Sequence, residues 1–232
     1  MRTVLVTGAN RGIGLEFSRQ YAADGWRVLA CSRNPEKSEA LNNLAAQYPD
    51  RIKVHALDVA DLAQIDRLAK VLSDESIDLL VNNAGIYPQS DRNGFGHTDY
   101  ADWMLSFRVN SMAPLKMVEA FISHIARGRQ KVIVTITSKM GSIADNRGGG
   151  SYLYRSSKVA ANMVVRSLAI DLKPMGITAV LFHPGWVKTD MGGQYALLTV
   201  EQSVSSIRKT IDRLTPADSG KFFECDGRII PW

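Results

Sequence analysis

The sequence predicts an α/β fold, a doubly wound parallel sheet of about seven strands with helices on both faces. Two observations support this. Short apolar runs alternate with segments of helical period along all 232 residues, and no low-complexity linker divides them. Strand-helix-strand units connect through right-handed crossovers, so neighbouring strands become parallel in a three-layer α/β/α arrangement. We therefore expect residues 1–232 to form a single domain.

The first half of the chain repeats the pattern of a strand followed by a helix. Ile13, Phe17 and Tyr21 recur at every fourth position after the first apolar run, the spacing of one helical face. Pro114 has no amide hydrogen and should kink or break the long helix in which it falls. Strands and helices are predicted in alternation at residues 3–6, 12–24, 28–32, 35–48, 52–57, 61–73, 77–81 and 100–127.

The second half keeps this rhythm. A β-branched run predicts another buried strand, and a periodic segment marks one apolar face of a last helix at Val200, Val204, Ile207, Ile211 and Leu214. The remaining predicted elements are a strand at 132–137, a helix at 153–171, and strands at 177–182 and 222–224.

Charge and composition restrict the kinds of partner. The net charge is +5, but Lys and Arg are scattered, which argues against a nucleic-acid partner. Charged and polar residues interrupt every apolar run before the roughly 18 residues of a membrane-spanning helix. The first predicted strand starts almost at Met1 and leaves no room for a signal peptide. We expect a soluble cytoplasmic protein with no membrane partner.

Cysteines and histidines show no pattern of a metal site. Cys31 and Cys225 lie in predicted strand regions far apart in sequence and have no CxxC partner, which is typical of buried free thiols. We expect no bound metal, because no ligand or triad spacing relates His55, His97, His124 and His183.

A glycine-rich turn follows the first predicted strand and opens a periodic helix. Its spacing is Gly-x-x-x-Gly-x-Gly. Free amides at a helix N-terminus, without side chains in the way, form a site for a pyrophosphate. The alternative is an ordinary strand-to-helix turn. The residues predicted to contact a dinucleotide here are Gly8, Asn10, Arg11, Gly12, Ile13 and Gly14.

The end of the second predicted strand indicates which dinucleotide is bound. A carboxylate there would accept hydrogen bonds from a free ribose 2'-hydroxyl, but this strand ends in Cys31-Ser32-Arg33. The guanidinium groups of Arg33 and Arg11 can clamp a 2'-phosphate, each contact contributing about 1.5 to 3 kcal/mol. This favours NADP(H). The alternative is that both arginines are solvated surface residues.

Two further segments follow predicted strands at the same edge of the sheet. Asp58 and Val59 should lie near the adenine, although Asp58 could equally cap the next helix. Asn83, Ala84 and Gly85 are small enough for the backbone to pass close to a ribose or pyrophosphate.

The clearest indication of chemistry is Tyr154 followed four residues later by Lys158, because this spacing places both on one helical face. A free phenol has a pKa of about 10, and an ammonium group ~5 Å away favours its ionised form by ~3 kcal/mol at an effective dielectric of ~20. We therefore expect a phenol with a lowered pKa that donates a proton as a carbonyl accepts hydride. Tyr152 competes but falls on another face.

Two polar residues complete the predicted reacting group. Ser138 ends a predicted strand and could polarise the same carbonyl oxygen. Asn110 lies in the long helix and could hold a water that connects Lys158 to solvent. The alternatives are a turn serine and an asparagine that marks only a kink or cap.

These motifs together resemble the short-chain dehydrogenase/reductase family, over nearly the whole chain. They are TGxxxGxG from Thr7, NNAG from Asn82, Ser138 with YxxxK from Tyr154, and Pro184-Gly185. The resemblance implies a Rossmann fold and a catalytic tetrad that includes Asn110. It also implies that Lys158 bonds the nicotinamide ribose and that Asn83 faces the adenosine side. The carboxamide would be held beyond Pro184 and Gly185, by the Val187 backbone and Thr189.

Within this family, the beginning of the chain, the CSRNPEK stretch and the ending DGRIIPW are similar to sniffer-type carbonyl reductases and to bacterial C-factor proteins. The expected function is NADPH-dependent reduction of a small aldehyde or ketone. Alternatives are a C-factor-like signalling or NADP(H)-sensing protein with vestigial catalysis, and an NAD-dependent alcohol dehydrogenase. The resemblance also implies a homodimer or homotetramer, formed by the helices at 100–127 and 153–171.

Overall fold

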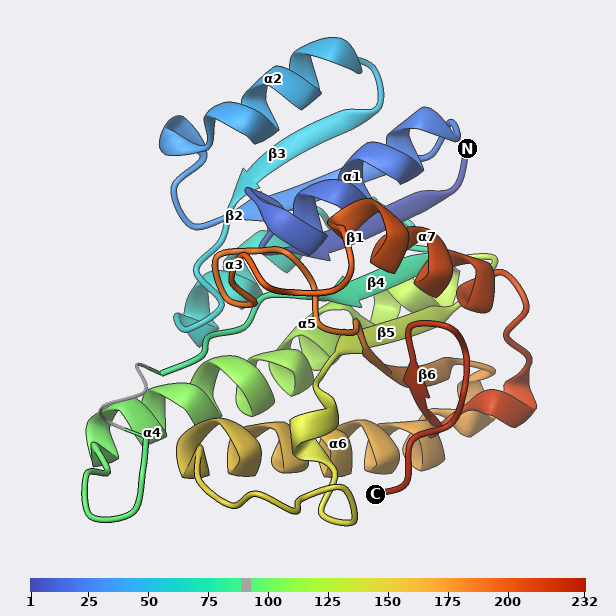
Figure 1. The fold of residues 1–232 in the computed structure, drawn as a ribbon. Coiled ribbons are helices and arrows are strands. Elements are labelled where there is room, and N and C mark those ends of the chain that lie inside the picture. Colours follow the sequence, from blue (N-terminus) through green and yellow to red (C-terminus); the bar gives the residue numbers. More distant parts are fainter. Residues whose placement is uncertain (89–92) are drawn as a thin grey trace.

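Seven parallel strands form one sheet in the order β3-β2-β1-β4-β5-β6-β7 (Figure 1). The computed structural model describes residues 1–88 and 93–232. The predicted fold class and strand number are confirmed. The strands are β1 (Thr3–Thr7), β2 (Arg27–Ser32), β3 (Ile52–Ala56), β4 (Leu79–Asn82), β5 (Val132–Ile136), β6 (Thr178–His183) and β7 (Phe222–Glu224).

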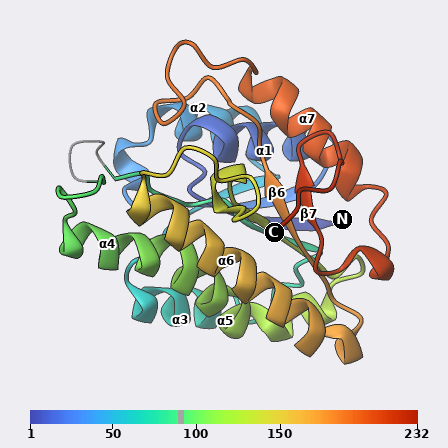
Figure 2. The same cartoon turned by 60° about the horizontal axis from the view of Figure 1, so that its bottom comes forward.

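Helices cover both faces of this sheet (Figure 2). One face carries α1, α2 and α7, and the other carries α3, α5 and α6, with α4 packed beside α6. This is the doubly wound arrangement that the strand-helix alternation predicts. The α-helices are α1 (Gly12–Ala23), α2 (Glu39–Gln47), α3 (Leu62–Val71), α4 (Tyr100–Phe107), α5 (Ala113–Arg127), α6 (Tyr152–Asp171) and α7 (Val200–Ile211).

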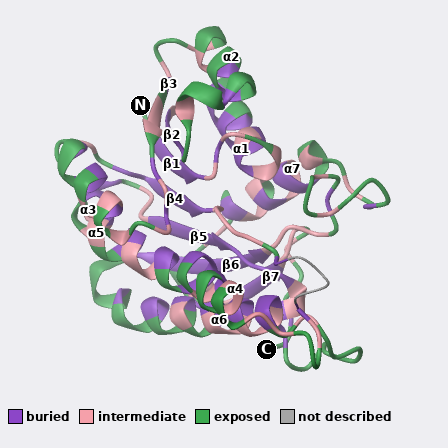
Figure 3. Cartoon of the chain, turned by 90° about the vertical axis from the view of Figure 1, so that its left-hand side faces the viewer, coloured by how far each residue is buried: buried purple, intermediate pink, exposed green. Residues whose placement is uncertain are grey.

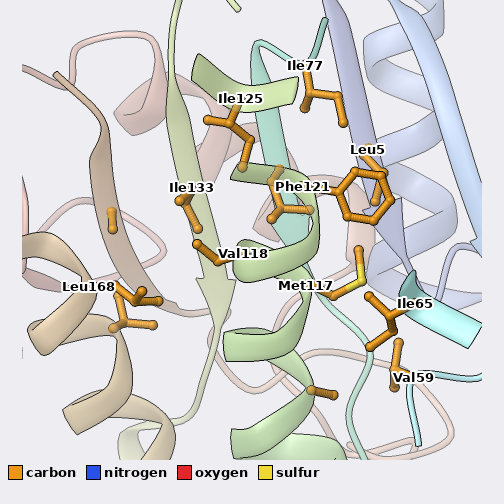
Figure 4. Close-up of a cluster of buried hydrophobic side chains, with 14 of the residues drawn as sticks. Leu5, Val59, Ile65, Ile77, Met117, Val118, Phe121, Ile125, Ile133 and Leu168 are labelled. Carbon is orange, nitrogen blue, oxygen red and sulfur yellow. The ribbon is translucent and has the colours of Figure 1, made fainter. Parts of the chain in front are cut away.

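The core consists of two apolar layers, one on each side of the sheet. Successive strand residues point to opposite faces, so Leu5 of β1 joins the layer under α5 while Val4 joins the layer under α1. Met117 and Phe121 of α5 pack in the same cluster as Leu5 (Figure 4). Apart from the edge strand β3, where Lys53 and Ala56 are exposed, the strands are almost wholly buried, and most exposed residues lie on the outer faces of the helices and in loops (Figure 3).

Two predicted helices are divided in the structure. The segment at 35–48 consists of a 3₁₀ turn, η1 (Pro35–Lys37), followed by α2, because Ser38 between them leaves helical geometry at φ −96° and ψ 62°. The predicted long helix at 100–127 consists of α4 and α5, joined by one π-helical turn, η3 (Arg108–Met112). Pro114 lies in the first turn of α5, so the predicted irregularity exists but precedes the proline.

Shorter features complete the description. Further 3₁₀ turns are η4 (Lys139–Gly141), η5 (Lys173–Met175) and η6 (Pro216–Asp218). Both cysteines are free thiols: Cys31 is buried in β2 as predicted, whereas Cys225 follows β7 and is only half-buried. Among the described residues, none of the helices is long and apolar enough to cross a membrane.

Candidate active site

The candidate site lies at the carboxyl edge of the sheet, where β1 and β4 are neighbours. From β1 the chain passes to α1 on one face, and from β4 it passes to helices on the other face. The loops after these strands therefore diverge and leave a crevice, the place where doubly wound proteins bind ligands. The loops that follow β5 and β6 end at the same edge.

The glycine turn after β1 depends on its missing side chains. Gly8 and Gly12 have φ values of +66° and +54°, which favour glycine. A Cβ atom on Gly14 would overlap the Gly8 carbonyl oxygen. The α1 helix, all of whose residues are described, begins after Arg11 with no acidic residue in its first turn and no side-chain cap. Its first amides are thus arranged to receive an anion.

The loop after β4 is fastened directly to this turn. The Asn83 side chain donates to the Thr7 and Gly8 carbonyl oxygens at 2.9 and 3.2 Å. The backbone amides of Asn83 and Ala84 both donate to the Thr7 hydroxyl at 3.0 Å. These bonds hold two of the predicted cofactor segments against each other.

The two arginines predicted to bind a 2'-phosphate are both exposed. Arg33 follows β2 directly. Arg11 forms an ion pair with Asp190, which the sequence did not suggest. This pair links the glycine turn to the loop after β6. The Thr189 side chain also lies beside the turn, because a Cβ on Gly12 would be 3.2 Å from its methyl group.

The segment after β3 resolves the alternative for Asp58. Asp61 caps α3, accepting hydrogen bonds from the amides of Ala63 and Gln64, so the helix-cap interpretation of Asp58 is wrong. The Asp58 carboxylate instead accepts from the amide of Ala60 at 2.9 Å in a tight turn. Val59, next to it, is buried.

Tyr154 and Lys158 lie on the first two turns of α6 and are both buried, with 7% and 4% of their surfaces exposed. The Lys158 ammonium nitrogen is 5.7 Å from the centre of the Tyr154 ring and donates to the Ile136 carbonyl oxygen at 3.1 Å. Ser138 follows β5, caps η4 by accepting from the Met140 amide, and lies close enough to the Tyr154 side chain to lower the pKa of its hydroxyl. The predicted serine, tyrosine and lysine are therefore brought together.

The expected lowering of the Tyr154 pKa is wrong for the protein as it stands. Burial raises the pKa of Tyr154 to about 12, against the opposing effect of the neighbouring Ser138 side chain. Burial also lowers the pKa of Lys158 to about 8. Attraction between the two groups favours both charged forms, but removal from water penalises both and is the larger effect here.

Asn110 lies in the π turn η3, and its side chain makes three hydrogen bonds within the protein. Its amide nitrogen donates to the Ile86 carbonyl oxygen and to the Ser157 hydroxyl, both at 3.0 Å, and its oxygen accepts from the Ile86 amide at 2.9 Å. The side chain therefore joins the loop after β4 to α6, and its oxygen can accept one further hydrogen bond. A Cβ on Gly85 would be 3.3 Å from the Asn110 oxygen and 3.4 Å from the Lys158 nitrogen.

The loop after β6 places the last group of predicted residues. Gly185 has a φ of +84°, and Ser203 of α7 donates to the Pro184 carbonyl oxygen at 2.6 Å. Val187 forms a bridge with Leu198, which closes the loop on itself. The Thr189 hydroxyl accepts from the Gly192 amide at 3.1 Å. This loop therefore returns to the crevice beside the glycine turn.

Tyr87 is a residue of the site that sequence reasoning missed. Its ring centre is 4.6 Å from that of Tyr154, with an interplanar angle of 51°, and its hydroxyl bonds to the Ser151 hydroxyl at 2.9 Å. It falls in a loop, where neither period nor motif indicates a partner. Only its position could have indicated a role, because Tyr87 lies four residues after Asn83, in the segment that the sequence predicts to approach the cofactor.

The burial of Lys158 predicts a pH dependence of stability. Its pKa is lowered from 10.5 to about 8 on folding, so between pH 8 and 10 the unfolded chain binds more protons here than the folded one. Stability from this group therefore rises with pH over that interval. We expect the urea unfolding free energy of the wild type, minus that of Lys158→Met, to increase from pH 8 to pH 10. A difference that stays constant or decreases would contradict the burial of a titrating ammonium.

The fold and these motifs define the class of protein. The profile of the family described as short chain dehydrogenase matches residues 2–197. The chain belongs to the short chain dehydrogenase family, whose members are oxidoreductases.

Similar proteins include the C-signal of Myxococcus xanthus and two carbonyl reductases of known structure. The chain is 44% identical to the C-signal of Myxococcus xanthus over 156 residues, which is 67% of this chain and 93% of that protein. Carbonyl reductase Sniffer of D. melanogaster has a TM-score of 0.92 at 31% identity, covering 100% of both chains. An NADPH-bound carbonyl reductase from chicken fatty liver also has a TM-score of 0.92, at 34% identity over 100% of this chain and 99% of that one.

Proposed function

We propose that residues 1–232 act as one NADPH-dependent reductase that transfers hydride to the carbonyl of a small aldehyde or ketone, with Tyr154 as the proton donor. One observation carries the proposal. Tyr154, Lys158 and Ser138 are buried together at the carboxyl edge of the sheet that also presents the glycine turn. The likeness to an NADPH-bound carbonyl reductase supports the choice of cofactor and of reaction.

The residues of the crevice fit a dinucleotide. The uncapped N-terminus of α1 offers amides to a pyrophosphate, and the small residues after β4 leave its approach open. In this proposal the nicotinamide end supplies hydride when NADPH is bound. The residues that would hold the dinucleotide are Gly8, Asn10, Arg11, Gly12, Ile13, Gly14, Arg33, Asp58, Val59, Asn83, Ala84, Gly85, Tyr154, Lys158, Pro184, Gly185, Val187 and Thr189.

The chain's own groups would handle the proton. Ser138 donates a hydrogen bond to the carbonyl oxygen and makes the carbonyl carbon more electrophilic. The Tyr154 hydroxyl gives its proton to the alkoxide that forms as hydride arrives. A phenol with a pKa of about 12 in the free protein remains protonated at neutral pH and is thus ready to act as the acid. Lys158 lies close enough to stabilise the phenolate that is left.

A screen for turnover tests this proposal. The purified protein is mixed with NADPH and a panel of aldehydes and ketones, and cofactor consumption is followed by absorbance. We expect turnover with at least one carbonyl compound, and slower turnover with NADH at the same concentration. Absence of turnover across the whole panel, in protein that binds NADPH, would contradict the reductase proposal.

The choice between NADPH and NADH tests the role of Arg33. Its guanidinium follows β2 and is free to reach a 2'-phosphate. Removal of one charge-assisted contact of about 1.5 to 3 kcal/mol should raise the Kd for NADPH at least tenfold in Arg33→Ala. Fluorescence titration should show an NADH Kd within about twofold of wild type. Equal losses for both nucleotides, or tighter NADH binding by the wild type, would overturn this assignment.

A second function is favoured by the match to the C-signal. In this alternative the chain is a signalling or NADP(H)-sensing protein, and its oxidoreductase activity is secondary or vestigial. The intact set of Ser138, Tyr154 and Lys158 favours the enzyme. The signalling effect of the protein in cells is compared between wild type and Tyr154→Phe. A signalling effect that persists in Tyr154→Phe would favour the signalling protein, whereas loss of both the signalling effect and turnover would favour the enzyme.

A further inference from the structure

The first turn of α6 is capped by a residue from another part of the chain. The residue before the helix, Ser151, has φ +47° and ψ 41°, and its side chain makes no cap hydrogen bond. A helix normally satisfies its first amides through a cap residue in extended geometry. Here Asn93, 58 positions earlier than Ser151, takes that role.

Asn93 accepts from two consecutive amides of this turn. Its backbone carbonyl accepts from the Tyr152 amide at 3.2 Å, and its side-chain oxygen accepts from the Leu153 amide at 2.8 Å. Only 2% of Asn93 is exposed, so water does not offer the same amides an easy replacement. The next residue along the helix is Tyr154.

A second contact from the loop after β4 lies on the same turn. The Tyr87 hydroxyl bonds to that of Ser151, and the Tyr87 ring packs on the Tyr154 ring. At its start this loop is held to the glycine turn by Asn83, and at Ile86 it is held by Asn110. The segment that forms one wall of the crevice therefore also fixes the beginning of the helix that carries the proposed acid.

We propose that Asn93 is a positioning residue for the proton-transfer step, because it fixes the first turn of α6 and with it the Tyr154 hydroxyl. The inference rests on the proposed function. A displacement of about 1 Å in a reacting group can cost about a hundredfold in rate. Loss of the cap should therefore lower kcat and affect cofactor binding much less, because all but two of the residues proposed to hold the dinucleotide lie outside α6.

Two substitutions separate this role from general damage. Asn93→Ala removes the side-chain acceptor, whereas Asn93→Asp keeps an oxygen in its place. Asn146→Ala is the matched control, because Asn146 also accepts from a loop amide, that of Gly149 at 3.0 Å, but is exposed. We expect kcat to fall at least tenfold in Asn93→Ala, with the NADPH Kd within twofold of wild type. Asn93→Asp should recover most of the lost kcat, and Asn146→Ala should resemble wild type.

Amide hydrogen exchange measures whether Asn93 protects the first turn of α6, independently of turnover. The Leu153 amide, whose acceptor is the Asn93 side chain, should exchange at least tenfold faster in Asn93→Ala than in wild type or Asn93→Asp. If the wild type is active and the kcat of Asn93→Ala lies within twofold of it, the inference is overturned. Unchanged amide exchange in Asn93→Ala would also overturn it, as would equal losses of kcat in Asn93→Ala and Asn93→Asp. If the wild type shows no turnover but the Leu153 amide exchanges as expected, the proposed reductase function is wrong, whereas the cap by Asn93 is present.

Discussion

Tyr154→Phe is expected to lower kcat at least a thousandfold while the protein remains folded and binds NADPH. The substitution deletes one oxygen and keeps the ring that packs against Tyr87. General acid catalysis by a positioned side chain contributes about 10² to 10⁴ in rate, and in the proposed mechanism this hydroxyl is the proton donor. The measurement is steady-state turnover with the best carbonyl substrate, alongside NADPH titration.

The same helix provides a control for this substitution. Tyr152→Phe removes a phenol that is 42% exposed and two residues away from the proposed acid. We expect its kcat to stay within about threefold of wild type, since its side chain points to another face of α6. Comparable losses in both variants would mean that α6, and not the Tyr154 hydroxyl, had been disturbed. A Tyr154→Phe variant within tenfold of wild type would remove Tyr154 from the mechanism.

Gly14→Ala is expected to damage both stability and cofactor binding. The added Cβ would overlap the Gly8 carbonyl oxygen and approach the Asn83 side chain that joins the two loops. The backbone of the turn must then shift, and overpacking of this kind costs about 1–3 kcal/mol. We expect a lower midpoint in chemical denaturation and an NADPH Kd at least tenfold higher, because the amides that face the pyrophosphate move with the turn.

Gly148→Ala is the matched comparison. It makes the same chemical change in a loop where the new Cβ would meet no atom within 4 Å. Its unfolding free energy should remain within about 0.5 kcal/mol of wild type, with unchanged NADPH binding. If Gly14→Ala behaved in the same way, the close packing of the glycine turn would not be a requirement for the site.

Much of the fold was predictable because buried strands and amphipathic helices leave strong periodic patterns. The last helix begins at Val200, the first predicted apolar position, but ends at Ile211, so Leu214 of the predicted face lies beyond it. Boundaries that depend on single dihedral angles were harder to predict. Nothing in the residue types around Ser38 indicates that the chain leaves helical geometry there, or that a π turn precedes Pro114.

In the candidate site, too, features set by local sequence patterns were predictable, whereas contacts between distant segments were not. Glycine spacing and the Tyr154 to Lys158 interval are local patterns, and the structure places these groups at one edge of the sheet. Contacts between distant segments have no such pattern, so neither the Asn93 cap nor the Arg11 to Asp190 ion pair was expected. The predicted direction of the Tyr154 pKa shift was also wrong. The shift depends on burial of the phenol, and the spacing of two residues does not reveal burial.

The distance between Tyr154 and bound cofactor tests the central claim most directly. A crystal structure of the protein with NADP⁺ would measure it without reference to any particular substrate. We expect the Tyr154 hydroxyl to lie within about 5 Å of the nicotinamide ring, so that one carbonyl group can contact both. A hydroxyl more than about 10 Å from the ring, beyond relay by a single water, would contradict it.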